Sequence, residues 1–235
     1  MVFPRSGDEG WLDEVSHAVI DDMEFAHTIT QADVDAIRYY VDYVRALHAR
    51  VGGTLIVEQD VPIDHITGEP NATGRSDAIV IAPPHIWVCD AKFGKKKVLA
   101  YDVVEPETFD PLTGEQVPEQ RRMNLQLAMY VLGALRKHCA DLDIQKARAV
   151  VVQPLLDSIA EYETSVAELS ALSVWLSERA EETRSAPKFS PTFENCIFCR
   201  AKGVCPARTE VLMSKAIEGF DDVHDSPTVD DLDLF

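Results

Sequence analysis

The clearest hydrophobic pattern in the chain is a pair of apolar, β-branched runs on either side of a Pro-Pro turn. This pattern predicts two antiparallel strands, over residues 75–82 and 85–91. In the second run, IWVCDAKFG, Asp90 and Lys92 interrupt an otherwise apolar stretch. Because side chains alternate along a strand, these two residues are predicted to share one face. Polar interruptions of a buried strand are typical of functional sites.

Three other segments, residues 31–50, 119–138 and 164–183, have apolar residues at helical spacing. Each is predicted to form a helix that packs through one face. In the second segment, Gln126 and Tyr130 lie four positions apart and should share a face. Without neighbouring motifs, both residues would be interpreted as the edge of the apolar stripe.

The remaining patterns complete an α/β fold. Residues 54–63 and 147–153 are short apolar runs that predict strands. Residues 102–119 are rich in Pro, Glu and Asp and predict an irregular insert. The polar, acidic segment 213–235 is predicted to be disordered. We therefore expect a central mixed sheet flanked by helices.

The two predicted hairpin strands bring candidate chemistry together. Asp77 lies on the first strand and Asp90 on the second, so two carboxylates and the Lys92 amine would converge on one surface. Mg²⁺ prefers carboxylate oxygens and keeps waters, one of which can become a nucleophile. Lys92 would then orient that water or offset charge on a phosphate. The simpler alternatives are a weak surface ion pair for the D-x-K triplet and a turn role for Asp77.

A second cluster follows in ENCIFCRAKGVCPAR, where Cys196, Cys199 and Cys205 have the spacing of three metal ligands. Gly203 and Pro206 supply turns around them. Disulfides would be expected in a short secreted chain, but no segment resembles a signal peptide. We therefore favour a metal or Fe–S site.

Charge modifies this picture. The chain has 235 residues, 46% of them hydrophobic, and a formal net charge of −18, which argues against a simple nucleic-acid binder. Positive charge nevertheless gathers beside the motifs, at Lys95, Lys96, Lys97, Arg121 and Arg122. Such a basic track inside an acidic shell would admit a single DNA strand while discouraging non-specific binding. The alternative is that the three lysines form a solvated turn.

Taken in order, GxxD (Gly74 to Asp77), DxK (Asp90 to Lys92), QxxxY and the CxxC with a further Cys resemble a known family. The set is similar to the PD-(D/E)XK nucleases of the RecB-like type, including CRISPR-associated RecB-like exonucleases and their phage-borne relatives. The resemblance covers roughly residues 54–210 and lies in order and spacing. It implies a restriction-endonuclease-like core.

The resemblance also implies roles for individual residues. Asp77 and Asp90 would bind Mg²⁺ or Mn²⁺, and Lys92 would be the catalytic lysine. Gln126 and Tyr130 would position the scissile strand. Glu58 is a candidate for a further carboxylate, although a Glu on a half-exposed strand usually marks the solvent face.

The domain organisation follows from the same resemblance. It divides the chain into an N-terminal helical segment, the nuclease core, the cysteine segment and the acidic tail, at residues 1–53, 54–190, 191–212 and 213–235.

In this family three C-terminal cysteines join one upstream cysteine to hold a [4Fe–4S] cluster. The present sequence departs from that pattern, because no Cys precedes Cys89 and no His matches the N-terminal motif. We expect either that the chain begins downstream of the usual start or that it belongs to a divergent subgroup. Completion by another ligand, a zinc ion and a degraded cluster all remain open.

The expected function is divalent-metal-dependent DNA cleavage, most simply exonucleolytic on single strands or DNA ends in recombination, repair or phage DNA metabolism. The alternative is an inactive DNA-binding or adaptor module with the same fold. The acidic end DDLDLF suggests a recombinase or the single-strand-binding machinery as partner. No apolar run approaches the roughly 20 residues needed to span a bilayer, so we expect a cytoplasmic protein of a bacterial or phage-infected cell. A homo-oligomer remains open.

Overall fold

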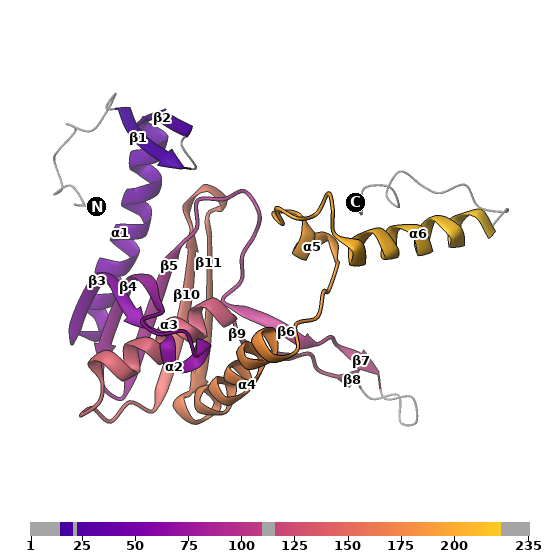
Figure 1. Cartoon of the computed structure of the whole chain (residues 1–235). Helices are drawn as coiled ribbons and strands as arrows, with labels where there is room; N and C mark the ends of the chain where they lie inside the picture. The colour runs from indigo at the N-terminus through magenta and orange to yellow at the C-terminus, as the bar shows by residue number, and fades with distance from the viewer. Residues whose placement is uncertain (1–14, 21–22, 110–115, 222–235) are drawn as a thin grey trace. The chain divides into compact units, whose positions relative to one another are not determined.

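A computed structural model of the chain describes residues 15–20, 23–109 and 116–221 (Figure 1). The chain divides into two units, Met1–Glu181 and Glu182–Phe235. The first unit contains the central sheet and the helices that cover it. The second contains the cysteine segment and the last helix.

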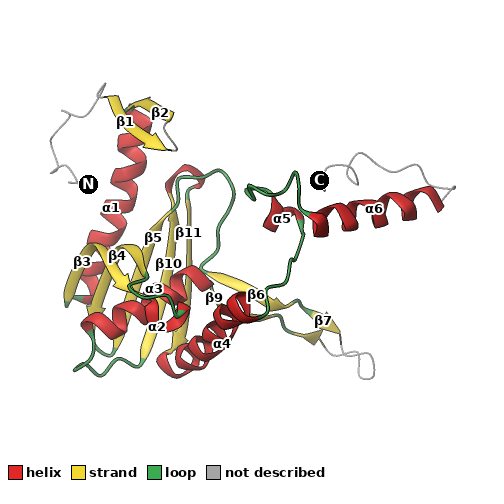
Figure 2. Cartoon of the chain, viewed as in Figure 1, coloured by secondary structure: helices red, strands yellow, loops and turns green. Residues whose placement is uncertain are grey.

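The central sheet has five strands in the order β11, β10, β5, β4, β3 (Figure 2). They are β3 (Thr54–Pro62), β4 (Thr73–Ala82), β5 (His85–Ala91), β10 (Lys146–Gln153) and β11 (Ser158–Ser165). All neighbouring pairs are antiparallel except β10 and β5, which are parallel. The expected mixed sheet is therefore present, and the expected hairpin corresponds to β4 and β5.

Helices cover both faces of this sheet. Helix α1 (Gln31–Val51) packs Tyr40 and Val44 against Val80 and other buried residues of one face. Helices α3 (Leu125–His138) and α4 (Val166–Ser185) pack against the opposite face, in a core that includes Ile79 and Val88. Because both faces are buried, the central strands have continuous apolar runs rather than a polar outer face.

Local capping explains where the helices begin. Thr30 and Asp33 form a capping box at the start of α1, each side chain bonding the other residue's backbone N–H. Asn124 caps α3, accepting a hydrogen bond from the backbone of Gln126 (3.1 Å). The prediction of a helix from residue 119 was wrong at its start, because Gln120–Met123 pair with Tyr101–Glu105 as strands.

The segment between β5 and α3 contains more regular structure than we expected. Its residues form two short antiparallel pairs, and the expected irregular insert is therefore partly wrong. The strands are β6 (Tyr101–Glu105), β7 (Thr108–Phe109), β8 (Gln116–Val117) and β9 (Gln120–Met123). The β-branched and aromatic residues within this acidic segment supply the strand preference.

Smaller elements complete the first unit. A hairpin of β1 (Val15–Ile20) and β2 (Met23–Thr28) precedes α1, where we had expected only helix. Short turns of helix occur at α2 (Asp64–Thr67) and at the 3₁₀ helix η1 (Pro154–Leu156).

The second unit contains α5 (Phe193–Cys196) and α6 (Pro206–Asp221). Helix α6 begins at a proline, a residue favoured at the first helical position, and extends into the segment 213–235 that we expected to be disordered. The DDLDLF end lies outside the described residues. Among the helices of the described ranges, none is both long and apolar enough to cross a membrane.

Candidate functional site

The candidate site begins where strands β4 and β5 separate. Their regular pairing ends at Ala78 and Cys89. Beyond that pair, the backbone N–H of Ala91 donates a hydrogen bond to Asp77 Oδ2 (2.8 Å). The Asp77 carboxylate therefore replaces a backbone acceptor of β4 and is held beside the end of β5.

Glu58 lies opposite Asp77 on the neighbouring strand β3. The register pairs Val57 with Ala78 and Gln59 with Ser76, which leaves Glu58 facing Asp77 without regular pairing. Glu58 has φ 49°, in the left-handed region that a non-glycine residue rarely adopts. Such conformations cost about 1–3 kcal/mol and cluster at functional sites.

The conformation of Glu58 also shifts the alternation of side chains along β3. The residues before and after Glu58 therefore do not follow one regular in-and-out pattern. Ile56 and Val61 both pack in the α3-side core, although simple alternation would place them on opposite faces. Glu58 accepts a hydrogen bond from Arg75 Nε (3.1 Å). Position 58 holds neither glycine nor proline, so the sequence could not have predicted this shift in the side-chain alternation.

Asp90 is the buried carboxylate of the site, with its side chain only 5% exposed. Its Oδ2 lies 2.8 Å from Lys92 Nζ, but this ion pair lacks regular hydrogen-bond geometry. Burial raises the pKa of Asp90, and the neighbouring ammonium group of Lys92 offsets that rise only in part. As predicted from the alternation of side chains, both groups lie together at the end of β5.

A chain of side-chain contacts then links β5 to α3. Lys92 Nζ donates to Gln126 Oε1 (3.3 Å), and Gln126 Nε2 donates to Tyr130 Oη (2.8 Å). The Tyr130 ring packs against Gly74, where an added Cβ would lie 2.5 Å from Cε1 of the ring. Residues from all three sequence motifs are thereby brought together.

The two aspartates of the site are poorly stabilised in their ionised forms. Burial raises the pKa of Asp77, and the nearby charges of Asp90 and Glu58 raise it further, while Lys92 opposes them. Two partly buried carboxylates with one ammonium group leave excess negative charge, which a divalent cation would neutralise. Nevertheless, within the described ranges no group of three or more His, Cys, Asp or Glu side chains is assembled to hold a metal. The fit to a metal therefore rests on the two aspartates and the incompletely paired Oδ2 of Asp90.

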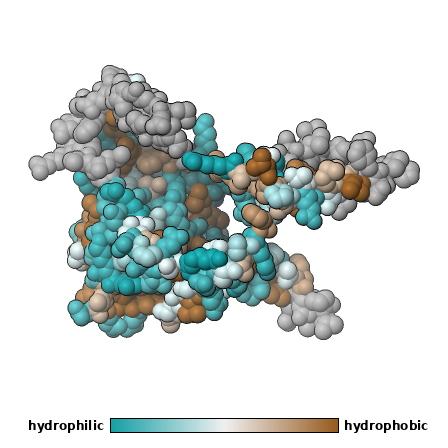
Figure 3. All heavy atoms as spheres, viewed as in Figure 1, coloured by the Kyte–Doolittle hydropathy of each residue, from teal (hydrophilic) through white to brown (hydrophobic). Residues whose placement is uncertain are grey.

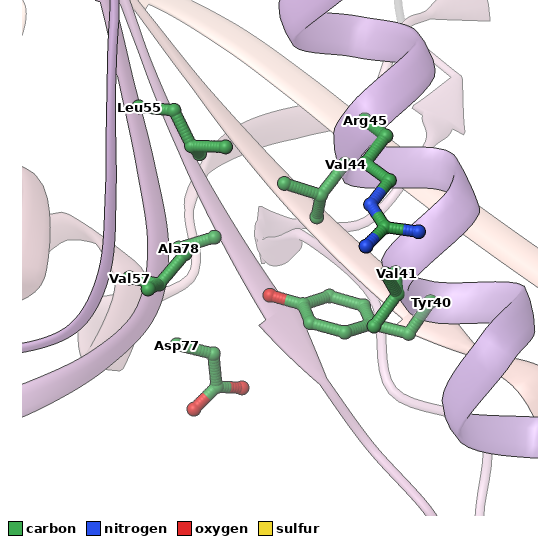
Figure 4. A pocket seen from close by; sticks show the side chains of 8 residues that line it. All are labelled: Tyr40, Val41, Val44, Arg45, Leu55, Val57, Asp77 and Ala78. Atoms are coloured by element: carbon green, nitrogen blue, oxygen red, sulfur yellow. The ribbon is translucent and has the colours of Figure 1, made fainter. Parts of the chain in front are cut away.

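A pocket of about 150 Å³ opens beside Asp77 on the α1 side (Figure 4). Its walls are side chains of α1, β3 and β4: Tyr40, Val41, Val44, Arg45, Leu55, Val57, Asp77 and Ala78. The Tyr40 hydroxyl donates to the backbone carbonyl of Cys89 (3.2 Å), and burial raises the pKa of that hydroxyl. Helix α1 thus borders the site across the sheet from α3, a role that the sequence did not indicate.

The predicted basic residues fall into two groups. Lys95, Lys96 and Lys97 are exposed on the loop that follows Lys92. Arg121 and Arg122 instead have local partners. Arg121 pairs with Glu119 and lies over the Tyr101 ring (4.3 Å to the centroid).

Arg122 lies 3.8 Å from an Asp102 carboxylate oxygen and 4.7 Å from the Trp175 ring centroid. The structure therefore presents the lysines more openly than the arginines. Trp175 is more than fifty positions from Arg122 in the chain, so sequence spacing gave no sign of this contact.

The three predicted cysteine ligands lie in the second unit. Cys196 ends α5, and Cys205 precedes α6. Between them, the backbone N–H of Cys199 donates a hydrogen bond to the carbonyl of Cys196 (3.1 Å) and closes a turn. All three thiols are free and at least partly exposed, and the described residues do not gather them into a metal-binding group. The two remaining cysteines, Cys89 and Cys139, are buried in the cores of the first unit.

Few apolar side chains of the second unit are covered. Among the described side chains between Glu182 and Ile217, none is buried. Phe198 and Val204 are 91% and 84% exposed, and apolar surface is visible on this unit in Figure 3. A small unit whose described side chains form no buried core usually needs a metal, a disulfide or a partner to hold its structure.

Comparisons with known proteins place the chain in a family. The family described as "Protein of unknown function (DUF2800)" matches residues 12–234, and the chain belongs to it. A solved structure titled "Crystal structure of SSO0001" is similar to this chain at 19% sequence identity, with a TM-score of 0.34. That similarity covers 76% of this chain and 72% of the other.

Proposed function

We propose that this member of the DUF2800 family is a divalent-metal-dependent deoxyribonuclease that acts on single strands or DNA ends. The supporting observation is the contact network that joins Asp90, Lys92, Gln126 and Tyr130, with Asp77 held at the end of the same strand. These residues come from separate segments, and their order resembles that of the PD-(D/E)XK nucleases. A structural ion pair alone would not need a Gln and a Tyr aligned behind it.

Asp77 and Asp90 are the residues that would hold Mg²⁺ or Mn²⁺, and Glu58 is the candidate for a third carboxylate. When bound, such an ion lowers the pKa of a coordinated water and offsets charge on the phosphate. The raised pKa values of both aspartates mean that their ionised forms are poorly compensated in the metal-free protein. Cation binding and carboxylate ionisation therefore support each other.

The chain's own cationic and polar groups would handle the DNA. The Lys92 ammonium group lies between Asp90 and Gln126, and there it would stabilise negative charge on a scissile phosphate. Gln126 and Tyr130 would position the DNA strand through their side-chain amide and hydroxyl groups. Lys95, Lys96 and Lys97 would contact neighbouring phosphates.

The cysteine segment is part of the same proposal. Cys196, Cys199 and Cys205 would provide three thiolates to a [4Fe–4S] cluster or to Zn²⁺. The exposed apolar side chains of the second unit favour such a stabilising group. Neither Cys89 nor Cys139 suits the fourth position, because both are buried in the first unit. A different donor would complete the site.

The wider setting belongs to this proposal as well. The enzyme would work on DNA inside a bacterial or phage-infected cell, in recombination, repair or phage DNA metabolism. A recombinase or the single-strand-binding machinery would be reached through the acidic tail.

Degradation of end-labelled single-stranded DNA tests the function directly. Anaerobically purified protein is incubated with Mn²⁺, with Mg²⁺ or with EDTA, beside the variant Lys92→Ala. The matched control is Lys146→Ala, which removes an exposed lysine paired with Glu163 at the other end of β10. We expect metal-dependent cleavage that Lys92→Ala abolishes and Lys146→Ala preserves.

Two other results would change the conclusion. Cleavage that survives both EDTA and Lys92→Ala would point to a contaminating nuclease. A folded protein that binds the labelled DNA but does not cleave it with either metal would favour the inactive binding or adaptor module instead.

A further inference from the structure

We propose that Gln153 is a positioning residue that holds the basic loop of residues 93–98 against the sheet, so that its lysines contact DNA phosphates beside the candidate site. The DNA-contacting part of this inference rests on the proposed nuclease function. Gln153 is the last residue of β10 and is 1% exposed. Within the described residues, it is one of three buried polar or charged side chains, with Ser76 and Asp90.

Both the oxygen and the nitrogen of the Gln153 amide bond the loop. Its Oε1 accepts a hydrogen bond from the backbone N–H of Val98 (2.7 Å), and its Nε2 donates to the backbone carbonyl of Lys96 (2.9 Å). Both bonds go to backbone groups on either side of Lys97. A buried amide that satisfies two backbone groups at once fixes the loop conformation, since losing it would leave both groups unpaired.

Gln153 lies on the same face of the sheet as the candidate site. In the parallel pairing of β10 with β5, Val151 is the partner of Asp90. Gln153 is two residues beyond Val151, so its side chain points to the same face as that of Asp90. The backbone N–H of Lys92 also donates to the carbonyl of Val152 (2.9 Å). The end of β10 therefore anchors the loop both where it leaves β5 and near Val98.

This anchoring explains why exposed lysines on an irregular loop would contribute to binding. Ordering a flexible loop on DNA costs conformational entropy, and a loop already fixed by Gln153 avoids most of that cost. The lysine side chains remain exposed and free to meet phosphates while their backbone is held. Loss of Gln153 should therefore weaken DNA binding more than it slows the chemical step.

The variant Gln153→Met tests the inference because it keeps the side-chain length and removes both hydrogen-bonding groups. Native-state trypsin digestion, followed by mass spectrometry, measures cleavage after Lys95, Lys96 and Lys97. We expect cleavage there at least about fivefold faster than in the unaltered protein. The matched control is Val150→Ala, which loses a buried side chain from the same strand and should lower the melting temperature without exposing the loop.

DNA affinity provides the functional measurement. Binding of a labelled single-stranded oligonucleotide is measured at several salt concentrations with Ca²⁺ in place of the activating metal. Gln153→Met should weaken binding about five- to tenfold and make it less salt-dependent, since each phosphate contact on a single strand contributes a slope of about 0.7. In cleavage assays, KM should rise while kcat stays within about twofold.

A combined variant separates action through the lysines from a general structural effect. If Gln153 acts by placing the lysines, Gln153→Met should cause little further loss of affinity in a Lys95→Ala, Lys96→Ala, Lys97→Ala background. Additive losses would overturn the inference, and so would an unchanged trypsin pattern. If the unaltered protein binds no DNA, the proposed function and the DNA-contacting role both fail, while trypsin digestion still decides whether Gln153 holds the loop.

Discussion

The two regions that carry candidate chemistry are built in opposite ways. The site around Asp90 joins three segments that lie apart in the sequence, on a sheet whose faces are both covered by helices. The cysteine segment places its candidate ligands within ten residues of one another, and none of the described side chains between Glu182 and Ile217 is buried. The first region is therefore shaped by packing alone, whereas the second would depend on the metal or cluster that we propose it binds.

The sequence motifs of the two regions are therefore informative for different reasons. In the first region, the motif residues matter because the fold links them, with Lys92 bonded to Gln126, Gln126 to Tyr130, and the Tyr130 ring packed on Gly74. In the second, the cysteine spacing itself is the signal, because nearby thiols can close around a metal with little help from a core. Substitutions should therefore affect catalysis in one region and metal retention in the other.

The largest expected effect is on catalysis in the first region. Asp90→Asn should lower the rate of DNA cleavage by at least about 1000-fold, since it removes a buried carboxylate proposed to bind the metal. The melting temperature of the metal-free variant should not fall, because burial already disfavours the Asp90 charge. Asp42→Asn, on an exposed position of α1, is the matched control. Cleavage by Asp90→Asn within tenfold of the unaltered protein would remove Asp90 from the site.

The next effect concerns the second region. Cys199→Ser should reduce bound iron or zinc at least about tenfold, measured by metal analysis and visible absorption after anaerobic purification. Trypsin should then cleave faster at Lys188 and Lys202, because none of the described side chains between Glu182 and Ile217 is buried to protect the backbone. Cys139→Ala, which alters a cysteine buried in the first unit, should retain the metal. Equal metal content in the two variants would break the contrast between the regions.

A steric test addresses packing in the first region. Gly74→Ala places a Cβ 2.5 Å from the Tyr130 ring, so the ring must move and its hydrogen bond with Gln126 must weaken. We expect cleavage to fall about tenfold or more and stability to fall by about 1–3 kcal/mol. Gly94→Ala is a control for stability alone, because an added Cβ there meets nothing within 4 Å. Chemical denaturation compares the two variants, and cleavage assays compare Gly74→Ala with the unaltered protein.

The smallest expected effect comes from removing a helix cap that should stabilise the first unit without any metal. The Glu168 carboxylate accepts hydrogen bonds from the backbone of Ser165 and from the hydroxyls of Thr164 and Ser165, all at 2.8 Å, which lower its pKa to about 2. Glu168→Gln should lower the free energy of unfolding by about 0.5–1 kcal/mol. Solvent screening of this exposed group keeps the effect small.

The sign of the pH dependence follows from the lowered pKa of Glu168. The unfolded chain has the higher pKa, so the stabilisation is complete above pH 4.5 and is lost as pH falls toward 2. Denaturation of both proteins between pH 7 and pH 3 measures this. The difference in free energy of unfolding between the unaltered protein and Glu168→Gln should shrink as the pH falls. A difference that stays constant or widens would contradict the capping role of Glu168.

The sequence by itself determined much of the first unit. Helical periodicity predicted α1 and most of α3 and α4, and apolar runs predicted the strands β3, β4, β5 and β10. It also placed Asp90 with Lys92 and Gln126 with Tyr130, because the repeat of a strand or helix fixes which nearby side chains share a face. Local patterns failed between β5 and α3, where pairing of β6 with β9 overrides the helical periodicity of residues 119–123.

Only the tertiary structure decided how these local pieces meet. The left-handed conformation of Glu58 and the contact of Gly74 with Tyr130 both depend on chain segments that are distant in sequence. The same holds for the burial of Gln153 beneath the loop of residues 93–98. Propensities act over a few residues, whereas these contacts depend on strand register and on the packing of helices against the sheet. The sequence therefore determined which residues could act together, and the fold determined which of them do meet.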